Sequence, residues 1–128
     1  MVTAFVARIN AHDPLALAEL MTDDHVFIDG LGNRHEGRSL MIEGWKQYFA
    51  MVPDYWIRTE VLLSSDGTVA VFGRAGGTYA PGSPPEPSQR WEVPAAWRAE
   101  VRGDRLGVWQ VYADNLPLRQ LRGSERAS

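Results

Sequence analysis

The sequence has no cysteine and a single lysine, Lys46, among its 128 residues. Without cysteine, neither disulfide bonds nor thiolate metal sites can form. The formal net charge of −3 offers no basic field for a phosphate backbone, so nucleic acid is not an expected partner. Apolar runs are short as well, because Arg8, Asn10 and His12 interrupt the first one and no later run is long enough for a membrane span. We therefore expect a cytoplasmic protein with no membrane partner.

Apolar and aromatic residues, in contrast, are plentiful. Hydrophobic residues make up 45% of the chain, and five tryptophans supply material for a core and a pocket. A chain of this length usually forms one domain with one core. We expect residues 1–122 to form a single domain and residues 123–128 to be a flexible tail.

Helical periodicity is confined to the first part of the chain. Apolar residues at helical spacing predict a helix over residues 2–11, a second that begins at Pro14 and ends before Thr22, and a third over residues 38–52. A short apolar strand over residues 25–28 and a turn region over residues 30–37 lie between the second and third helices.

Strands dominate the rest of the chain. Alternating patterns predict strands over residues 55–63, 68–79, 89–101 and 105–114, with a Pro-rich loop over residues 80–88 and a short helical segment over residues 116–121. Gly76 and Gly77 indicate a bulge or a tight bend, and Pro94 a bulge or a sheet edge. In the strand over residues 89–101, the odd-numbered residues from Trp91 to Val101 are apolar and predict the inward face.

This order of elements, with ELMTDDHVFID and EGRSLMIEGWKQYF near the start and DRLGVWQVYAD near the end, resembles the nuclear transport factor 2-like superfamily. The nearest resemblance is to its ketosteroid isomerase-like and SnoaL-like polyketide cyclase group. The resemblance implies a cone-shaped, cystatin-like α+β fold, in which a curved antiparallel sheet wraps around three N-terminal helices and leaves an apolar pocket. It also implies a homodimer formed through the sheet. The group contains enzymes and binding domains, so the fold alone does not assign a function.

Asp29 and His35 are the candidate catalytic residues. Asp29 follows the apolar strand at the position where proteins similar to ketosteroid isomerase keep a proton-shuttling aspartate, and a carboxylate in an apolar pocket suits that chemistry. The alternative is an Asp-Gly turn in which the carboxylate accepts backbone hydrogen bonds. His35, in the turn region after Asp29, could act as a proton relay, since imidazole titrates in a suitable range; the alternative is an exposed histidine.

The usual helpers of such an aspartate are missing. An ungapped match to the isomerases places Phe5 at their tyrosine, and Ala95 or Ala96 at their protonated aspartate. Each donor of an oxyanion hole commonly contributes about 3 to 4 kcal/mol to transition-state stabilisation. True steroid isomerase activity is therefore not expected.

A larger set of residues is expected to line the pocket, where aromatic rings would shape it and polar groups would orient a ligand. The set comprises Phe5, Phe27, Trp45, Tyr48, Arg74, Trp91, Trp97, Trp109, Tyr112 and Asp114. Core packing and a dimer face are the alternatives for the aromatic residues. Arg74 could instead pair with Glu60 or another nearby carboxylate, and Asp114 could simply end its strand.

No cofactor or metal is implied, because no nucleotide or phosphate-loop pattern occurs and the histidines lack ligand spacing. Two functional hypotheses follow. In the first, the protein is an isomerase, cyclase or hydrolase-type enzyme that acts on a small hydrophobic or aromatic molecule by general acid/base catalysis. In the second, it is a non-catalytic ligand-binding or dimerisation domain of the same fold.

Overall fold

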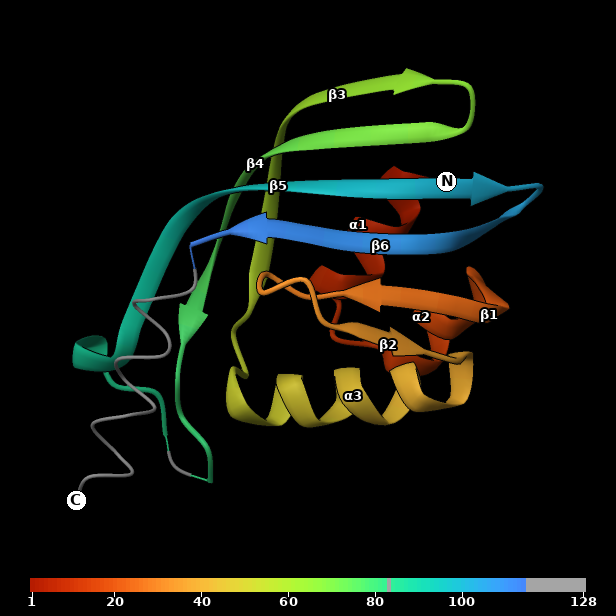
Figure 1. Ribbon diagram of the computed structural model, residues 1–128. Helices are drawn as coiled ribbons and strands as arrows, with labels where there is room; N and C mark the ends of the chain where they lie inside the picture. The colour runs from red at the N-terminus through yellow and green to blue at the C-terminus, as the bar shows by residue number, and fades with distance from the viewer. Residues whose placement is uncertain (83, 115–128) are drawn as a thin grey trace.

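A computed structural model describes residues 1–82 and 84–114 (Figure 1). The described helices are α1 (Val2–Asn10), α2 (Pro14–Glu19), α3 (Arg38–Met51) and the short 3-10 helix η1 (Pro87–Gln89). The strands are β1 (Met21–Ile28), β2 (Arg34–Glu36), β3 (Trp56–Ser65), β4 (Thr68–Thr78), β5 (Arg90–Arg102) and β6 (Arg105–Ala113). The helical segment expected over residues 116–121 and the tail expected over residues 123–128 lie outside the described residues.

The strands form one sheet in the order β2-β1-β6-β5-β4-β3. Figure 1 shows that β3, β4 and β5 bend sharply part-way along their length, so the sheet curves around the helices. The α+β architecture with three helices and a curved sheet is confirmed. The expectation of a wholly antiparallel sheet is wrong for one pair, because β1 runs parallel to β6. The two segments are far apart in the sequence, so no local turn signal reveals their relative direction.

Local sequence features account for the helices. Val2, Phe5, Val6 and Ile9 bury one side of α1. The side chain of Asp13 caps α2 by accepting a hydrogen bond of 3.1 Å from the backbone N–H of Ala16, and Pro14 begins the helix as predicted.

The bend of the sheet depends on glycines in β4. A Cβ atom on Gly73 would lie 1.8 Å from the backbone oxygen of Arg58, and one on Gly77 would lie 2.4 Å from Cγ1 of Val52. The predicted bulge at Gly76 and Gly77 is wrong, because the β4–β5 register runs without a shift; the bulge lies in β3, between Thr59 and Val61. β4 does bend part-way along its length (Figure 1).

Two other expectations concern strand limits. β1 begins at Met21, earlier than the predicted start at residue 25. The exposed Asp23 and Asp24 hide the apolar pattern of the strand, and the register of β1 with β6 shifts between Met21 and Val26. Pro94 lies just beyond the β5–β6 ladder, which begins at the pair Ala95–Ala113, as the sheet-edge alternative predicted.

The core fills the concave side of the sheet. The odd-numbered residues of β5 from Val93 to Ala99 are buried, which confirms the predicted inward face, and they pack with α1 and α3. No helix among the described residues is long and apolar enough to cross a membrane.

Candidate functional site

Asp29 follows the last residue of β1 and caps the turn that leads into β2. Its Oδ1 atom accepts hydrogen bonds from the backbone N–H groups of Leu31, at 2.9 Å, and Asn33, at 3.0 Å. This is the turn role that the sequence left open as an alternative. The role occupies only Oδ1, however, and leaves Oδ2 for another partner.

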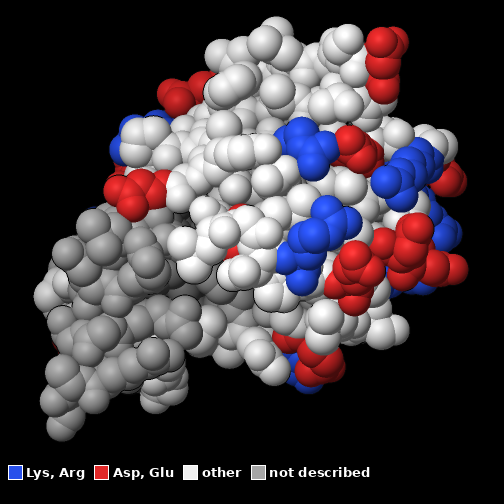
Figure 2. Space-filling model, in the orientation of Figure 1, with Lys and Arg blue, Asp and Glu red and all other residues white. Residues whose placement is uncertain are grey.

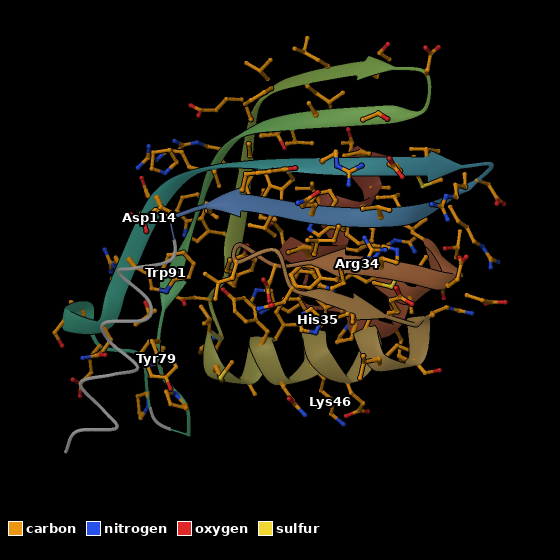
Figure 3. The ribbon with its side chains drawn as sticks, viewed as in Figure 1. Arg34, His35, Lys46, Tyr79, Trp91 and Asp114 are labelled. Carbon is orange, nitrogen blue, oxygen red and sulfur yellow. The ribbon has the colours of Figure 1, made fainter. Side chains whose placement is uncertain are left out.

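That partner is His35. Phe27 and His35 are opposite each other in the β1–β2 ladder, and their rings lie 5.8 Å apart. The Nε2 atom of His35 lies 3.1 Å from Oδ2 of Asp29. The side chains of His35 and Asp29 are 42% and 29% exposed, so the pair lies at a rim that solvent reaches. We call these two residues the rim pair; Figure 3 shows His35 between β2 and α3.

Opposing effects act on the pKa of Asp29. Partial burial raises the pKa, but hydrogen bonds from His35, Asn33 and Leu31 favour the ionised form, and the net result is a pKa below the ordinary value. Asp29 is therefore a carboxylate at neutral pH. Because a carboxylate can only accept, Nε2 of His35 donates to it, and in the neutral imidazole Nδ1 is left as an acceptor.

A continuous row of aromatic rings leads away from the rim pair along the concave face. Successive centroids are 6.1 Å apart from Phe27 to Trp45, 6.2 Å from Trp45 to Tyr48, 4.9 Å from Tyr48 to Tyr55 and 6.1 Å from Tyr55 to Trp91. We call these five residues the aromatic row. Phe27, Tyr48 and Trp91 are partly buried, and Trp45 and Tyr55 are buried. Burial raises the pKa of Tyr55, with a contribution from the neighbouring Tyr48, so its hydroxyl stays protonated.

Phe5, Trp97 and Trp109 are brought together, but deeper in the molecule. The rings of Phe5 and Trp109 are 4.9 Å apart, and those of Trp97 and Trp109 are 6.1 Å apart and nearly parallel. All three side chains are buried in the core.

Arg74, Tyr112 and Asp114 are not brought to the rim pair. Arg74 and Tyr112 lie on the outer face of the sheet, where Nε of Arg74 donates to Oε2 of Glu92 at 2.6 Å. This is the ion pair with a nearby carboxylate that the sequence offered as an alternative. Asp114 is exposed just after the end of β6, and Figure 3 shows it, like Trp91, toward the bent end of the strands.

One cavity among the described residues lies at the bend, with a volume of about 310 Å³. Its lining residues are Asp54, Trp56, Gly77, Arg90, Trp91 and Glu92. Trp91 is one of the residues that the sequence predicted to line a pocket, and neither member of the rim pair lines the cavity.

Sequence reasoning missed His25. Its side chain is fully buried, and Nδ1 lies 2.7 Å from the backbone oxygen of Leu106, so Nδ1 donates and Nε2 is an acceptor. Burial lowers the pKa of His25 and keeps the imidazole neutral. The signal was available, since His25 is two residues before Phe27 and alternation puts both on one face.

Several buried polar atoms have no hydrogen-bond partner within the described part of the chain. They are Nε2 of His25, Oγ1 of Thr22 and the indole Nε1 atoms of Trp91, Trp97 and Trp109. An unpaired buried donor or acceptor costs about 1 to 3 kcal/mol of stability, so such atoms need an explanation. A cluster of three or more potential metal-ligating side chains is absent from residues 1–82 and 84–114.

The sequence matches the family model of the SnoaL-like domain over residues 2–108. The chain belongs to the SnoaL-like domain family. None of the curated protein sequences matches it.

Solved structures agree with this family on the fold. A protein of ketosteroid isomerase-like fold from Catenulispora acidiphila, in complex with trimethylamine, superposes with a TM-score of 0.80 at 23% identity and covers 95% of this chain and 91% of its own. A protein named as a SnoaL-like polyketide cyclase, from Jannaschia, has a TM-score of 0.80 at 18% identity, with 94% and 87% covered. A cystatin-fold protein from Novosphingobium aromaticivorans has a TM-score of 0.67 at 23% identity, with 86% and 92% covered.

Proposed function

We propose that this SnoaL-like protein binds a small hydrophobic or aromatic molecule against the aromatic row and acts on it by general acid/base catalysis through the rim pair. The observation that carries the proposal is the hydrogen bond of 3.1 Å between Asp29 and His35 on the concave face. The Catenulispora protein supports ligand binding, because its structure contains a small organic molecule.

The chemistry divides between the two residues of the pair. The lowered pKa of Asp29 makes its carboxylate a weak base, so the proton acceptor within the pair is Nδ1 of His35. A C–H bond next to a carbonyl breaks, the proton moves to Nδ1 and the electron pair moves to the carbonyl oxygen. Asp29 orients the imidazole and stabilises the imidazolium that forms. Return of the proton to another carbon completes an isomerisation.

The second candidate function is ligand binding or dimerisation without catalysis. Oδ1 of Asp29 is engaged in the turn, and Phe5 is a buried core residue that offers no donor. These two observations favour this alternative, because a pair that only fixes the turn would need no substrate.

We propose that the protein forms a homodimer through the sheet, whichever of the two functions it has. On the outer face, Val61, Phe72, Ala96 and Tyr112 follow one another across β3, β4, β5 and β6, and Val61, Phe72 and Tyr112 are exposed. Figure 2 shows that charged side chains gather mainly toward the right of this view, beside a largely uncharged area. Analytical ultracentrifugation should give a dimer for the natural chain and a monomer for Tyr112→Glu; a monomeric natural chain would rule the dimer out.

A ligand screen followed by turnover measurements tests the catalytic proposal. Compounds that raise the melting temperature are assayed as substrates with the natural chain, Asp29→Asn and His35→Gln. We expect each substitution to lower kcat by about 100-fold, the lower end of general acid/base contributions. Asp104→Asn, in the turn between β5 and β6, is the matched control. Ligands that bind but never react, or turnover that is unchanged in both variants, would favour the non-catalytic alternative.

A further inference from the structure

The cavity at the bend lies apart from the rim pair and has its own pattern of charge. Its volume of about 310 Å³ is at the lower end of the range for sites that hold small ligands. Two tryptophan rings line it together with three charged side chains, those of Asp54, Arg90 and Glu92. Aromatic walls with a few polar groups are typical of sites for small molecules.

The strand register places two of these charges on opposite sides of Thr78. Arg90 is opposite Thr78 in the β4–β5 ladder. Asp54 precedes β3, the neighbour of β4 on the other side. Its carboxylate accepts hydrogen bonds from the backbone N–H of Thr78, at 2.6 Å, and from the Thr78 hydroxyl, at 2.7 Å. The carboxylate of Asp54 and the guanidinium of Arg90 therefore belong to opposite walls of the cavity.

Glycines in β4 keep the space between these walls open. In the next row of the sheet, Trp56 is opposite Gly76, and Gly76 is opposite Glu92. A Cβ atom on Gly76 would lie 2.8 Å from Cζ2 of Trp56, and one on Gly77 would lie 3.3 Å from Oδ1 of Asp54. A side chain at either position would press on a residue that lines the cavity. The ring of Trp56 thus lies over a stretch of backbone without side chains.

Two of the three charged groups have no opposite charge beside them. Glu92 is neutralised by Arg74, whose Nε atom donates to Oε2 at 2.6 Å. Neither Asp54 nor Arg90 forms an ion pair with any residue in the described part of the chain. The hydrogen bonds that Asp54 accepts come from neutral groups, and each carboxylate oxygen has room for a second donor. One wall is therefore negative and the other positive, and neither charge is compensated.

We propose that the cavity at the bend binds a small zwitterion with an apolar side chain, of the class of free aromatic α-amino acids. The ammonium group lies at Asp54, and the carboxylate accepts two parallel hydrogen bonds from Arg90. The apolar side chain lies against the rings of Trp56 and Trp91. An ion of one sign would leave the opposite wall unpaired, whereas a zwitterion pairs with both. The site is separate from the rim pair and does not depend on the proposed catalysis.

Three probes of similar size test the two charges separately. Phenylalanine carries both charges, N-acetylphenylalanine has no ammonium group, and phenylalaninamide has no carboxylate. Affinities are measured from the indole N–H signal of Trp56 in proton–nitrogen correlation spectra, at about pH 6.5, where the amine of the amide is protonated. Trp56 is the reporter because it lines the cavity but does not belong to the aromatic row. Phenylalanine should bind about 10-fold more tightly than either derivative, because each derivative loses one charge-assisted contact at a partly exposed site.

Two variants assign each charge of the ligand to its wall. Asp54→Asn should bind phenylalanine and N-acetylphenylalanine about equally, because an amide can still contact Thr78 but carries no charge. Arg90→Gln should bind phenylalanine and phenylalaninamide about equally. Asp104→Asn and Arg105→Gln, at the turn between β5 and β6, remove the same charges elsewhere on the surface and should keep both preferences.

Three outcomes would overturn the inference. If N-acetylphenylalanine binds the natural chain as tightly as phenylalanine, the cavity reads only the negative charge of its ligand. If phenylalaninamide binds as tightly, the cavity reads only the positive charge. If none of the probes moves the Trp56 signal, the cavity is not a site for this class of molecule. In each case the function proposed for Asp29 and His35 still stands, because neither residue lines the cavity.

Discussion

At the rim of the concave face, both carboxylate oxygens of Asp29 have partners, one in the turn and the other in His35. In the interior, Trp97 and Trp109 bury indole N–H groups that have no partner in the described part of the chain. The rim is thus polar and partly exposed, and the carboxylate there has hydrogen-bond partners. The interior is apolar and closed, and its indole N–H groups lack acceptors among the described residues. The comparison separates the region of the proposed proton transfer, at the rim pair, from the closed interior that holds the fold together.

The largest effect should come from removing an interior ring. Trp109→Ala deletes a fully buried side chain that packs on Phe5, so we expect a loss of about 3 to 5 kcal/mol in the free energy of unfolding. Urea denaturation measures the loss. His35→Ala, at the rim, should cost less than about 1 kcal/mol. Equal costs would mean that the two regions do not differ as described.

An intermediate effect should appear in the pH dependence of stability. Burial lowers the pKa of His25 in the folded protein below the value of 6.5. The unfolded chain therefore takes up a proton first as the pH falls, and stability decreases below about pH 6.5, by at most about 1.4 kcal/mol per pH unit.

Denaturation at about pH 7.5 and about pH 5.5 tests this direction, in a range where histidine titrates. His25→Phe should remove most of the dependence, and the control His35→Gln should keep it. If the loss of stability is the same in His25→Phe as in the natural chain, the buried imidazole is not its source.

The smallest effect on stability should come from Asp29→Asn. The amide oxygen can still accept the two backbone hydrogen bonds of the turn, and only the interaction with His35 changes. Because the pair is partly exposed, we expect a change below about 1 kcal/mol, measured by urea denaturation at neutral pH. A loss as large as that of Trp109→Ala would make Asp29 a structural residue first.

Much of the fold could be predicted because it depends on local patterns. The alternation in β5 gave its buried face, and Pro14 and Asp13 gave the start of α2. The direction of β1 against β6 could not be predicted, because it depends on segments far apart in the chain. The outward direction of Arg74 followed only once the strand register was known.

The site was predictable to a similar extent. Asp29 and His35 are six positions apart, and a tight turn was enough to suggest their contact. The unpaired indoles of Trp97 and Trp109 were not foreseeable, since the absence of a partner depends on everything packed around a side chain. The inward direction of His25 could be read from its spacing to Phe27, but its hydrogen bond to Leu106 of β6 depends on segments far apart in the chain.

The most direct test of the account is proton exchange at the methyl group of acetophenone in deuterated water. A rim pair that takes protons from carbon should accelerate deuterium uptake above the buffer rate. His35→Gln and Asp29→Asn should each lower that rate, His35→Gln by about 100-fold, and the control Asp104→Asn should not. Uptake at the buffer rate with the natural chain, or at the full rate with His35→Gln, would contradict the account.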